Sequence, residues 1–352
     1  MVDTCGDLKM SKTILVTGGQ GFICSHICQD LLSHGYNVVS MDCMNKYGKI
    51  DRPQDKHPNF QLINHDLTKP VDNYDLSNID CIIAGAARIG GITYFSKYPY
   101  RIMRDNELIL ANTFDLALRL NKYNNLKKIV AISSSMVYEG ADYSDLPKER
   151  IWPTKEELYW ELPPPRSVYG AQKANLERWC QAAWEEHGLP FNVVRPFNCV
   201  GVGEDEALDD VNITQGGVSL MSSHVLPDLI KKALALKSTD KLPLLGDGSQ
   251  VRHYTNGKDV ARGIRMVAES AEPGSDFNIS SDRPCTVKEL ATIVWNQIHG
   301  CDPVFECHPP LNYDVQMRSP DVTKAKTVLG FEAEVSLEDS VAEVISYMRG
   351  RV

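Results

Sequence analysis

Hydrophobic residues fall in short runs along the chain, separated by stretches in which they recur every three or four positions. Short apolar runs that stop at glycine or polar residues are typical of buried parallel strands, and the periodic stretches are typical of helices packed on a sheet. The pattern predicts strands over residues 13–16, 37–41, 59–63, 80–84, 128–133 and 191–195, and helices over 22–33, 106–120 and 169–187.

The alternation of these elements predicts an α/β fold with a Rossmann-like, doubly wound parallel sheet. Three segments interrupt it: residues 139–166 are acidic and aromatic, residues 202–223 are polar and glycine-rich, and residues 273–320 are rich in loop signals. Excursions after the carboxyl ends of strands are where an open α/β sheet binds its ligands. We therefore expect the functional loops among these segments.

Charge and cysteine usage narrow the function classes. The net charge of −9, with no cluster of Lys and Arg, argues against a general nucleic-acid binder. The chain has no apolar run of about eighteen residues and no signal-peptide pattern at its start, so we expect a cytoplasmic protein that does not insert into membranes. The ten cysteines lack CxxC pairs, which predicts free thiols and no metal site.

The run TGGQGFI over residues 17–23 follows the first predicted strand and opens the first predicted helix. This is the context of a dinucleotide-binding fingerprint, in which glycines let backbone amides approach the pyrophosphate at the helix N-terminus. Cys24 departs from the fingerprint, because a small residue usually occupies its last position, and cofactor affinity is therefore expected to change. The fingerprint residues expected to bind cofactor are Gly18, Gly21, Phe22 and Ile23.

Asp42 ends the second predicted strand, 21 residues beyond Gly21. A carboxylate there can accept hydrogen bonds from the adenosine ribose and would repel a 2′-phosphate, so NAD is favoured over NADP. Asp66, after the third strand, is either an adenine contact or a solvated surface carboxylate.

Tyr169 and Lys173 are four residues apart on one helical face. A phenol has a pKa of about 10, and a nearby ammonium together with the positive nicotinamide is expected to lower it, so that Tyr169 acts as a base. The hydroxyl-rich run SSSMVY over residues 133–138 leaves an apolar strand at its carboxyl end, where the substrate is expected.

These motifs, together with RPFN over residues 195–198, resemble the extended short-chain dehydrogenase/reductase family, nucleotide-sugar branch. The resemblance covers essentially the whole chain. It implies catalytic roles for Ser134, Tyr169 and Lys173, with Lys173 also contacting NAD, and oxidation of a sugar at C4. It also implies cofactor contacts at Leu67 and Ala86, and substrate contacts at Gly90, Ser135, Asn198, Val225, Arg252, Arg318 and Asp321.

The choice of reaction depends on fewer residues. Dehydratase and decarboxylase relatives carry Glu where this chain has Met136, whose thioether cannot transfer protons. The runs AARIGG over 86–91 and SHVLP over 223–227 resemble GDP-fucose synthases and GDP-mannose 3,5-epimerases, in which His224 matches a basic residue. The favoured reading is a 4-epimerase working through a transient 4-keto sugar, with NAD retained. The alternatives are a C3/C5 epimerase or epimerase-reductase that uses His224, and a non-catalytic NAD-binding sensor or scaffold.

The length of 352 residues suggests two units. We expect an NAD-binding domain over residues 1–198, with a returning segment near 246–272, and a nucleotide-sugar-binding lobe formed by 199–245 and 273–352. Family resemblance implies a homodimer through the helices near 106–120 and 169–187.

Overall fold

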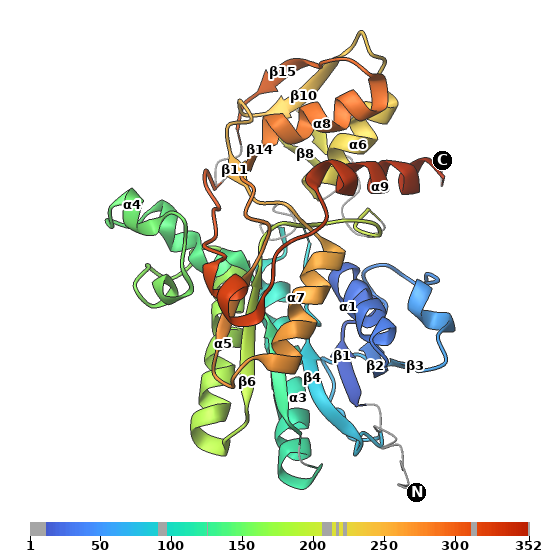
Figure 1. The fold of residues 1–352 in the computed structure, drawn as a ribbon, viewed down its shortest axis with the longest axis vertical. Coiled ribbons are helices and arrows are strands. Elements are labelled where there is room, and N and C mark those ends of the chain that lie inside the picture. Colours follow the sequence, from blue (N-terminus) through green and yellow to red (C-terminus); the bar gives the residue numbers. More distant parts are fainter. Residues whose placement is uncertain are drawn as a thin grey trace, which may run out of the picture.

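A parallel sheet of seven strands forms the centre of the larger lobe (Figure 1). The computed structural model describes residues 12–90, 97–124, 126–205, 213–215, 218–220, 224–310 and 315–350. The strand order is β13-β6-β5-β4-β1-β2-β3, and every neighbouring pair is parallel. The strands are β1 (Thr13–Thr17), β2 (Asn37–Asp42), β3 (Phe60–Asn64), β4 (Ile79–Ala84), β5 (Lys128–Ile132), β6 (Phe191–Pro196) and β13 (Asp276–Ile279).

The order of the strands reverses at β1, which lies between β2 and β4. The loops leaving β1 and β4 therefore diverge at their carboxyl ends and leave a crevice, which is where doubly wound sheets bind ligands. The side chain of Thr17, the last residue of β1, holds the two loops together: its Oγ1 accepts the backbone N–H groups of Gly85 and Ala86, each at 3.1 Å.

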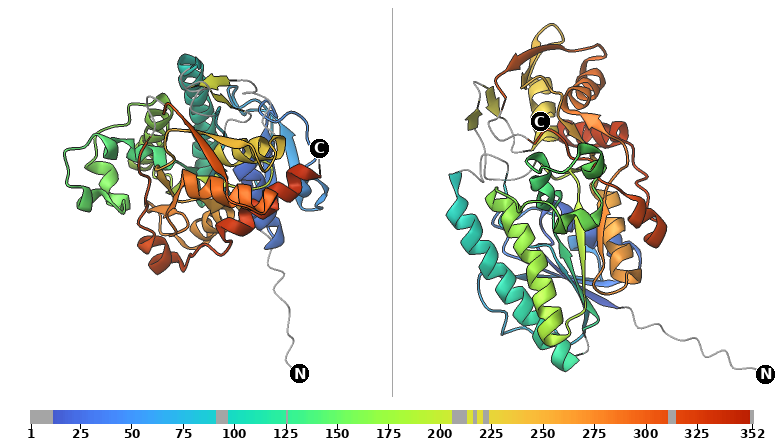
Figure 2. Two further views of the ribbon diagram at one scale, coloured as in Figure 1. Left: turned by 90° about the horizontal axis from the view of Figure 1, so that it is seen from above. Right: turned by 90° about the vertical axis from the view of Figure 1, so that its left-hand side faces the viewer.

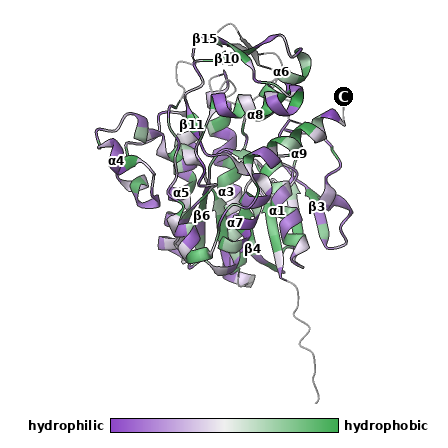
Figure 3. Cartoon of the chain, turned by 45° about the horizontal axis from the view of Figure 1, so that its top comes forward, coloured by the Kyte–Doolittle hydropathy of each residue, from purple (hydrophilic) through white to green (hydrophobic). Residues whose placement is uncertain are grey.

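Helices cover both faces of the sheet, as the alternating pattern predicts (Figure 2). On one face α1 (Phe22–Ser33) packs beside α7 (Gly257–Ser270), and on the other α3 (Pro99–Asn124) packs beside α5 (Val168–His187). Two separate apolar clusters fill the layers, and hydrophobic residues concentrate along the strands between them (Figure 3). The predicted doubly wound α/β architecture is confirmed.

The smaller lobe lies beyond the carboxyl edge of the sheet (Figure 1). It has its own core, in which residues such as Leu229, Leu242, Trp295 and Val341 are buried. Its regular elements are α6 (Val225–Ala235), α8 (Val287–His299), α9 (Leu337–Arg349), and the parallel pair β10 (Lys241–Leu245) and β15 (Val304–His308). No helix in the described residues is long and apolar enough to cross a membrane.

The loop prediction for residues 273–320 is wrong, because this segment holds β13, α8 and β15. β13 adds a seventh strand beside β6, beyond the returning segment proposed for 246–272, and α8 forms where turn signals at both ends had suggested loops. Thr286 and Glu289 form a reciprocal capping box at the start of α8, and Leu290, Ala291 and Val294 bury one face of the helix. The turn-forming residues at the start of α8 therefore mark the beginning of a helix and do not indicate a loop.

Several short elements lie outside the main sheet and the long helices. The acidic excursion holds 3-10 helices over Ser135–Asp142 and Glu156–Trp160 on either side of the short helix α4 (Lys148–Ile151). A further 3-10 helix spans Pro53–Lys56, and a π-helical turn spans Ala325–Leu329. The short strands are β7 (Cys199–Val200), β8 (Ile213–Gln215), β9 (Val218–Leu220), β11 (Val251–Arg252), β12 (Thr255–Asn256) and β14 (Cys285–Thr286).

Candidate active site

The fingerprint loop forms a close-fitting backbone cradle at the crevice beside β1. Gly18 has a φ of +78°, and a Cβ at this position would lie 2.9 Å from the Cα of Ala86. Gly21 precedes α1 as its N-cap, so the first amides of α1 face the loop. Phe22 is buried, and the half-buried Ile23 packs against the apolar cluster that contains Ile14 and Val16 of β1. The cradle fits the pyrophosphate of a dinucleotide.

Cys24 is accommodated by a glycine on the neighbouring loop. Its buried Sγ occupies the space in which a Cβ on Gly85 would lie. Burial raises the pKa of this thiol to about 12, so it stays protonated and packs as a small hydrophobe. The helix can therefore approach the sheet closely even without a small residue at this fingerprint position.

Asp42 lies at the end of β2 and organises the loop around it. Its Oδ2 accepts the N–H of Gln20 at 3.0 Å, and its Oδ1 accepts the N–H of Met44 at 2.7 Å. Burial raises the pKa of this carboxyl, while these amide bonds and the nearby Arg52 oppose the rise. The carboxyl thus joins the fingerprint loop to the β2 loop, at the position expected for the adenosine ribose.

The other predicted cofactor residues follow β3 and β4. The Oδ1 of Asp66 accepts both the N–H and the hydroxyl of Thr68, a local turn that orients the carboxylate. Leu67 is buried, and its carbonyl accepts a hydrogen bond from Asn112 at 2.8 Å. Ala86 lies against Gly18, as described above. The predicted adenine contact of Asp66 stays a prediction.

Ser134, Tyr169 and Lys173 come together between β5 and α5. The hydroxyl of Ser134 forms a hydrogen bond with the Tyr169 phenol, and Lys173 Nζ lies 6.0 Å from the centre of the Tyr169 ring. Lys173 Nζ donates to the carbonyl of Ile132, the last residue of β5, at 2.7 Å. The sequence motif therefore folds into a contiguous group whose tyrosine and lysine are buried.

The expected lowering of the Tyr169 pKa is not what the chain's own groups produce. Burial raises the pKa of Tyr169 to about 12, and only the hydrogen bond from Ser134 opposes this rise. Burial also lowers the pKa of Lys173 to about 8, while Glu177 favours its charged form. Desolvation disfavours both charged forms, so the helical spacing alone does not create a base.

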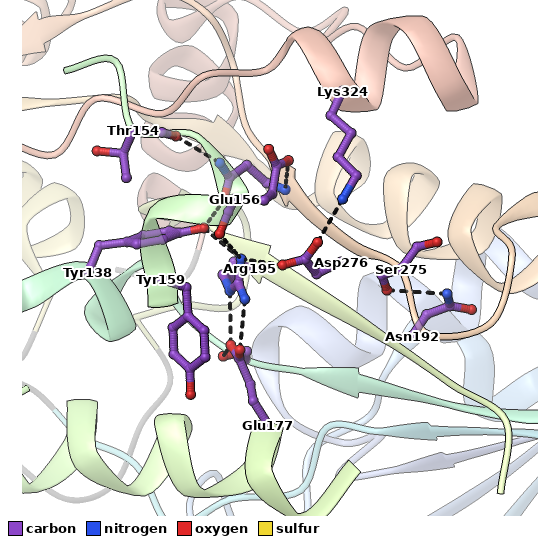
Figure 4. A network of polar contacts seen from close by, with 12 residues as sticks. Tyr138, Thr154, Glu156, Tyr159, Glu177, Asn192, Arg195, Ser275, Asp276 and Lys324 are labelled. Atoms are coloured by element: carbon purple, nitrogen blue, oxygen red, sulfur yellow. Dashed lines mark hydrogen bonds and ion pairs between the residues drawn. The ribbon is translucent and has the colours of Figure 1, made fainter. Parts of the chain in front are cut away.

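A buried ionic network continues from these residues into the centre of the lobe (Figure 4). Arg195, on β6, forms two hydrogen bonds to Glu177 at 2.9 and 2.7 Å, and an ion pair with Asp276 at 2.8 Å. Arg195 also donates to the hydroxyl of Tyr138 at 2.7 Å. Because an unpaired buried guanidinium is costly, these partners fix β6, β13 and α5 relative to one another.

His224 lies at the N-terminus of α6, beside a carboxyl that the sequence did not single out. Its Nδ1 is 3.4 Å from Oε1 of Glu204, whose side chain is 5% exposed. Burial lowers the pKa of His224 to about 3 and raises that of Glu204 to about 8, although the distance alone would permit an ion pair. We favour the neutral pair, because burial disfavours both charges. The ordinary histidine pKa assumed from sequence does not apply here.

Arg252 and Arg318 lie on neighbouring segments, joined by a 3.0 Å bond from the N–H of Arg318 to the carbonyl of Val251. Arg318 is buried and donates to the Met136 sulfur at 3.4 Å. Burial lowers its pKa to about 10, with Arg252 adding to the effect, and Asp142 opposes it. Two arginines so close together suit an anionic group such as a diphosphate.

The remaining predicted substrate residues occupy different settings. Gly90 and Ser135 are buried, Val225 is 37% exposed at the start of α6, and Asn198 donates to the carbonyl of His253 at 3.3 Å. Asp321 is directed elsewhere, because its Oδ1 accepts the N–H of Thr323 at 2.8 Å. Its predicted substrate contact stays a prediction.

Sequence reasoning missed Glu177 and Glu204, and it treated Arg195 only as part of a motif. Glu177 and Arg195 did carry a signal, since each is a charged residue on a largely buried helix face or strand. Such placement predicts a buried, paired ion. Glu204 gave no comparable signal, because its neighbourhood in the chain is polar. Among the described residues no cluster of His, Cys, Asp and Glu could hold a metal, and the nine described cysteines are free.

Curated proteins are similar to this chain in sequence over most of its length. UDP-glucuronic acid decarboxylase 1 of Danio rerio is 26% identical over 96% of this chain and 73% of its own length. UDP-glucuronic acid decarboxylase 6 of Arabidopsis thaliana is 29% identical over 95% of this chain and 88% of its own.

Two solved structures are similar in fold as well as in sequence. UDP-glucose 4-epimerase of Thermotoga maritima superposes with a TM-score of 0.75 at 25% identity, covering 96% of this chain and 99% of that one. UDP-glucuronic acid 4-epimerase of Bacillus cereus, solved with UDP-glucuronic acid and NAD, gives 0.75 and 25%, covering 97% and 100%. A sequence model of the NAD dependent epimerase/dehydratase family matches residues 14–280, and the chain belongs to that family.

Proposed function

We propose that this protein is a nucleotide-sugar 4-epimerase that works through a transient 4-keto sugar and retains its NAD. The observation that carries the proposal is the buried group of Ser134, Tyr169 and Lys173, which supplies what C4 oxidation requires. The alignment with two 4-epimerase structures over nearly their full length supports it.

Bound NAD supplies hydride transfer at C4 and the positive charge of the oxidised nicotinamide. Tyr169 takes the proton of the C4 hydroxyl, and Ser134 holds the same oxygen as it becomes a ketone. Lys173 places its amine 6.0 Å from the centre of the phenol ring, and in the charged form this amine would favour the phenolate. After the 4-keto sugar turns its other face, Tyr169 returns the proton, so the cycle leaves the protein unchanged.

We place the substrate between the lobe that holds the seven-stranded sheet, β13 included, and the smaller lobe built around α6, α8 and α9. Arg252 and Arg318 would hold its diphosphate, because their guanidinium groups approach one another and a dianion relieves their repulsion. Asp142 and Glu139 lie within electrostatic range of Arg318 and keep this region from excessive positive charge.

Decarboxylation is the nearest competing reaction, since the two curated relatives above carry that name. The position at which decarboxylase relatives carry Glu is occupied by Met136, whose sulfur accepts a hydrogen bond from Arg318. A thioether has no proton to give or to take at any useful pH. This substitution supports epimerisation over loss of the carboxyl group.

The test is product analysis by NMR after incubation with UDP-glucose, UDP-glucuronic acid and a GDP-sugar panel. The proposal predicts the 4-epimer of at least one substrate, with no added NADPH. With a uronic acid substrate the carboxyl carbon stays in the product. Formation of a pentose with release of CO₂ would contradict the proposal.

A C3/C5 epimerase or epimerase-reductase, similar to GDP-mannose 3,5-epimerase or GDP-fucose synthase, is the second candidate. The contact between Glu204 and His224 favours it, because a neutral carboxyl beside a neutral imidazole provides one proton donor and one proton acceptor. Turnover in deuterated water separates the candidates: label at C3 or C5 supports the second, and its absence supports 4-epimerisation.

We also propose a homodimer through α3 and α5. These helices pack side by side, and their outer surfaces carry exposed large hydrophobics: Tyr100, Leu108 and Tyr123 on α3 and Trp184 on α5. Exposed apolar side chains gathered on adjacent helices are typical of association surfaces.

A further inference from the structure

Ser133, the neighbour of the catalytic serine, is tied to the helix that carries the catalytic tyrosine. Its hydroxyl donates to Oε1 of Glu177 at 2.5 Å, and both side chains are buried. Ser133 precedes Ser134 at the end of β5, and Glu177 lies one helical turn beyond Lys173 on α5. This bond therefore sets the distance between the two elements on which Ser134 and Tyr169 stand.

Glu177 also acts on Lys173 through its charge. Burial lowers the pKa of Lys173 to about 8, and Cys24 on α1 and Glu177 oppose this effect. The Cys24 thiol, whose pKa burial raises to about 12, stays protonated near neutral pH, so the Glu177 carboxylate is the group that favours the charged ammonium there. A lysine whose pKa lies this close to neutrality loses its charge easily. The carboxylate one turn away therefore helps to decide whether Lys173 is positive when Tyr169 must give up its proton.

We propose that Glu177 is a positioning residue of the reaction centre, which aligns Ser134 with Tyr169 through Ser133 and keeps Lys173 positively charged. The inference rests on the proposed function, because it assigns Glu177 to the hydride-transfer step at C4. Glu177 does not reach the reacting atoms itself. It acts through Ser133 on geometry and through Lys173 on electrostatics.

The other carboxylate on Arg195 provides a matched control. Arg195 is held by Glu177 on one side and by Asp276 on the other, at 2.7 and 2.8 Å. Asp276 also pairs with Lys324 at 2.7 Å, on the side of the network away from α5 (Figure 4). Glu177→Gln and Asp276→Asn each leave Arg195 with one carboxylate, but only Glu177→Gln changes the environment of Ser133 and Lys173.

Three variants distinguish a positioning role of Glu177 from a purely structural one. Glu177→Gln should lower kcat by about tenfold or more, since small misplacements of reacting groups are costly, and should leave KM nearly unchanged. Its alkaline loss of activity should move to lower pH by roughly one unit, because Lys173 loses its charge sooner. Ser133→Ala should lower kcat without that pH shift, since the carboxylate remains. Asp276→Asn should lower the melting temperature as Glu177→Gln does, with kcat and its pH profile within about twofold of wild type.

A spectroscopic titration makes the test independent of the substrate. With NAD bound, the phenolate absorbance of Tyr169, obtained by subtracting the Tyr169→Phe spectrum, should appear at higher pH in Glu177→Gln than in wild type or Asp276→Asn. Equal effects of Glu177→Gln and Asp276→Asn on kcat, pH profile and titration would overturn the proposal, as would a Ser133→Ala enzyme of full activity. If wild type turns over no nucleotide sugar, the proposed function fails, while the titration still tests Glu177.

Discussion

The Sγ of Cys24 occupies the space directly above Gly85, so that the side chain missing from one residue makes room for the other. Cys24 belongs to α1 and Gly85 to the loop after β4, and the two elements meet at the crevice where the strand order reverses. In most dinucleotide fingerprints the small residue is on the helix. Here α1 and the loop after β4 still approach closely, because the small residue is Gly85 on that loop.

Because Cys24 fills the space beside Gly85, adding a methyl group at Gly85 should be destabilising. Gly85→Ala should destabilise the protein by roughly 1–3 kcal/mol, because the new Cβ overlaps Cys24 Sγ in a packed site. Cys24→Ala in the same chain should recover much of that loss, although Thr17 O, at 3.1 Å from the added Cβ, limits the recovery. Urea denaturation of both single variants and the double variant measures the coupling. Additive losses would show that the two residues do not share this space.

Asp42 predicts the choice of cofactor. Asp42→Asn should weaken NAD binding by about tenfold or more, because a charge-assisted hydrogen bond to the ribose is worth roughly 1.5–3 kcal/mol. It should also narrow the preference for NAD over NADP, since the repulsion of a 2′-phosphate is removed. Titration calorimetry with both cofactors tests this, with exposed Asp51→Asn on the same loop as the control. An unchanged ratio of the two affinities would place the adenosine ribose elsewhere.

Glu204 predicts how stability depends on pH. Its folded pKa, raised to about 8 by burial, lies above the unfolded value of 4.5, so its contribution is full below pH 4.5 and is lost as pH rises toward 8. Between pH 6.5 and pH 8 we expect a loss of about 2 kcal/mol from this group. His224, whose pKa is lowered, changes stability only below pH 6.5 and does not interfere. Glu204→Gln should flatten the dependence in this window, and parallel stability curves for both proteins would argue against a protonated Glu204.

The outer face of α3 predicts the oligomeric state. Leu108 is 41% exposed near the middle of this helix. Leu108→Glu should convert a dimer into a monomer, because a charge buried without a partner is costly. Light scattering after gel filtration measures the mass, and exposed Val328→Glu, outside both helices, serves as the control. A wild-type monomer, or a dimer in Leu108→Glu, would rule out this surface.

The central strands of the main sheet could be predicted because they are buried on both faces and are continuous apolar runs, unlike the largely exposed edge strand β3. β1 is an example, with every residue of Thr13–Thr17 buried. β13 could not, because Asp276–Ile279 is short, contains two polar residues and gains its identity from pairing with β6. Tertiary context, rather than local preference, decides such a strand.

The candidate site likewise contains some residues that the sequence could place together and others that it could not. Tyr169 and Lys173 are adjacent by helical spacing, and the motif that contains Ser134 follows a recognisable strand, so the sequence places them together. The Ser133 and Glu177 bond depends on how α5 lies against β5, and Glu204 meets His224 from a position twenty residues earlier in the chain. Their pKa values depend on burial, which only the folded structure provides.

The central claim is that the Tyr169 phenol moves the proton during C4 oxidation. The most direct measurement is kcat of Tyr169→Phe with the substrate identified by NMR, together with bound NAD and melting temperature. We predict a loss of about 10²–10⁴-fold in kcat, with NAD binding and stability retained, because only the hydroxyl that transfers the proton is removed. Turnover by Tyr169→Phe within about tenfold of wild type would contradict the account.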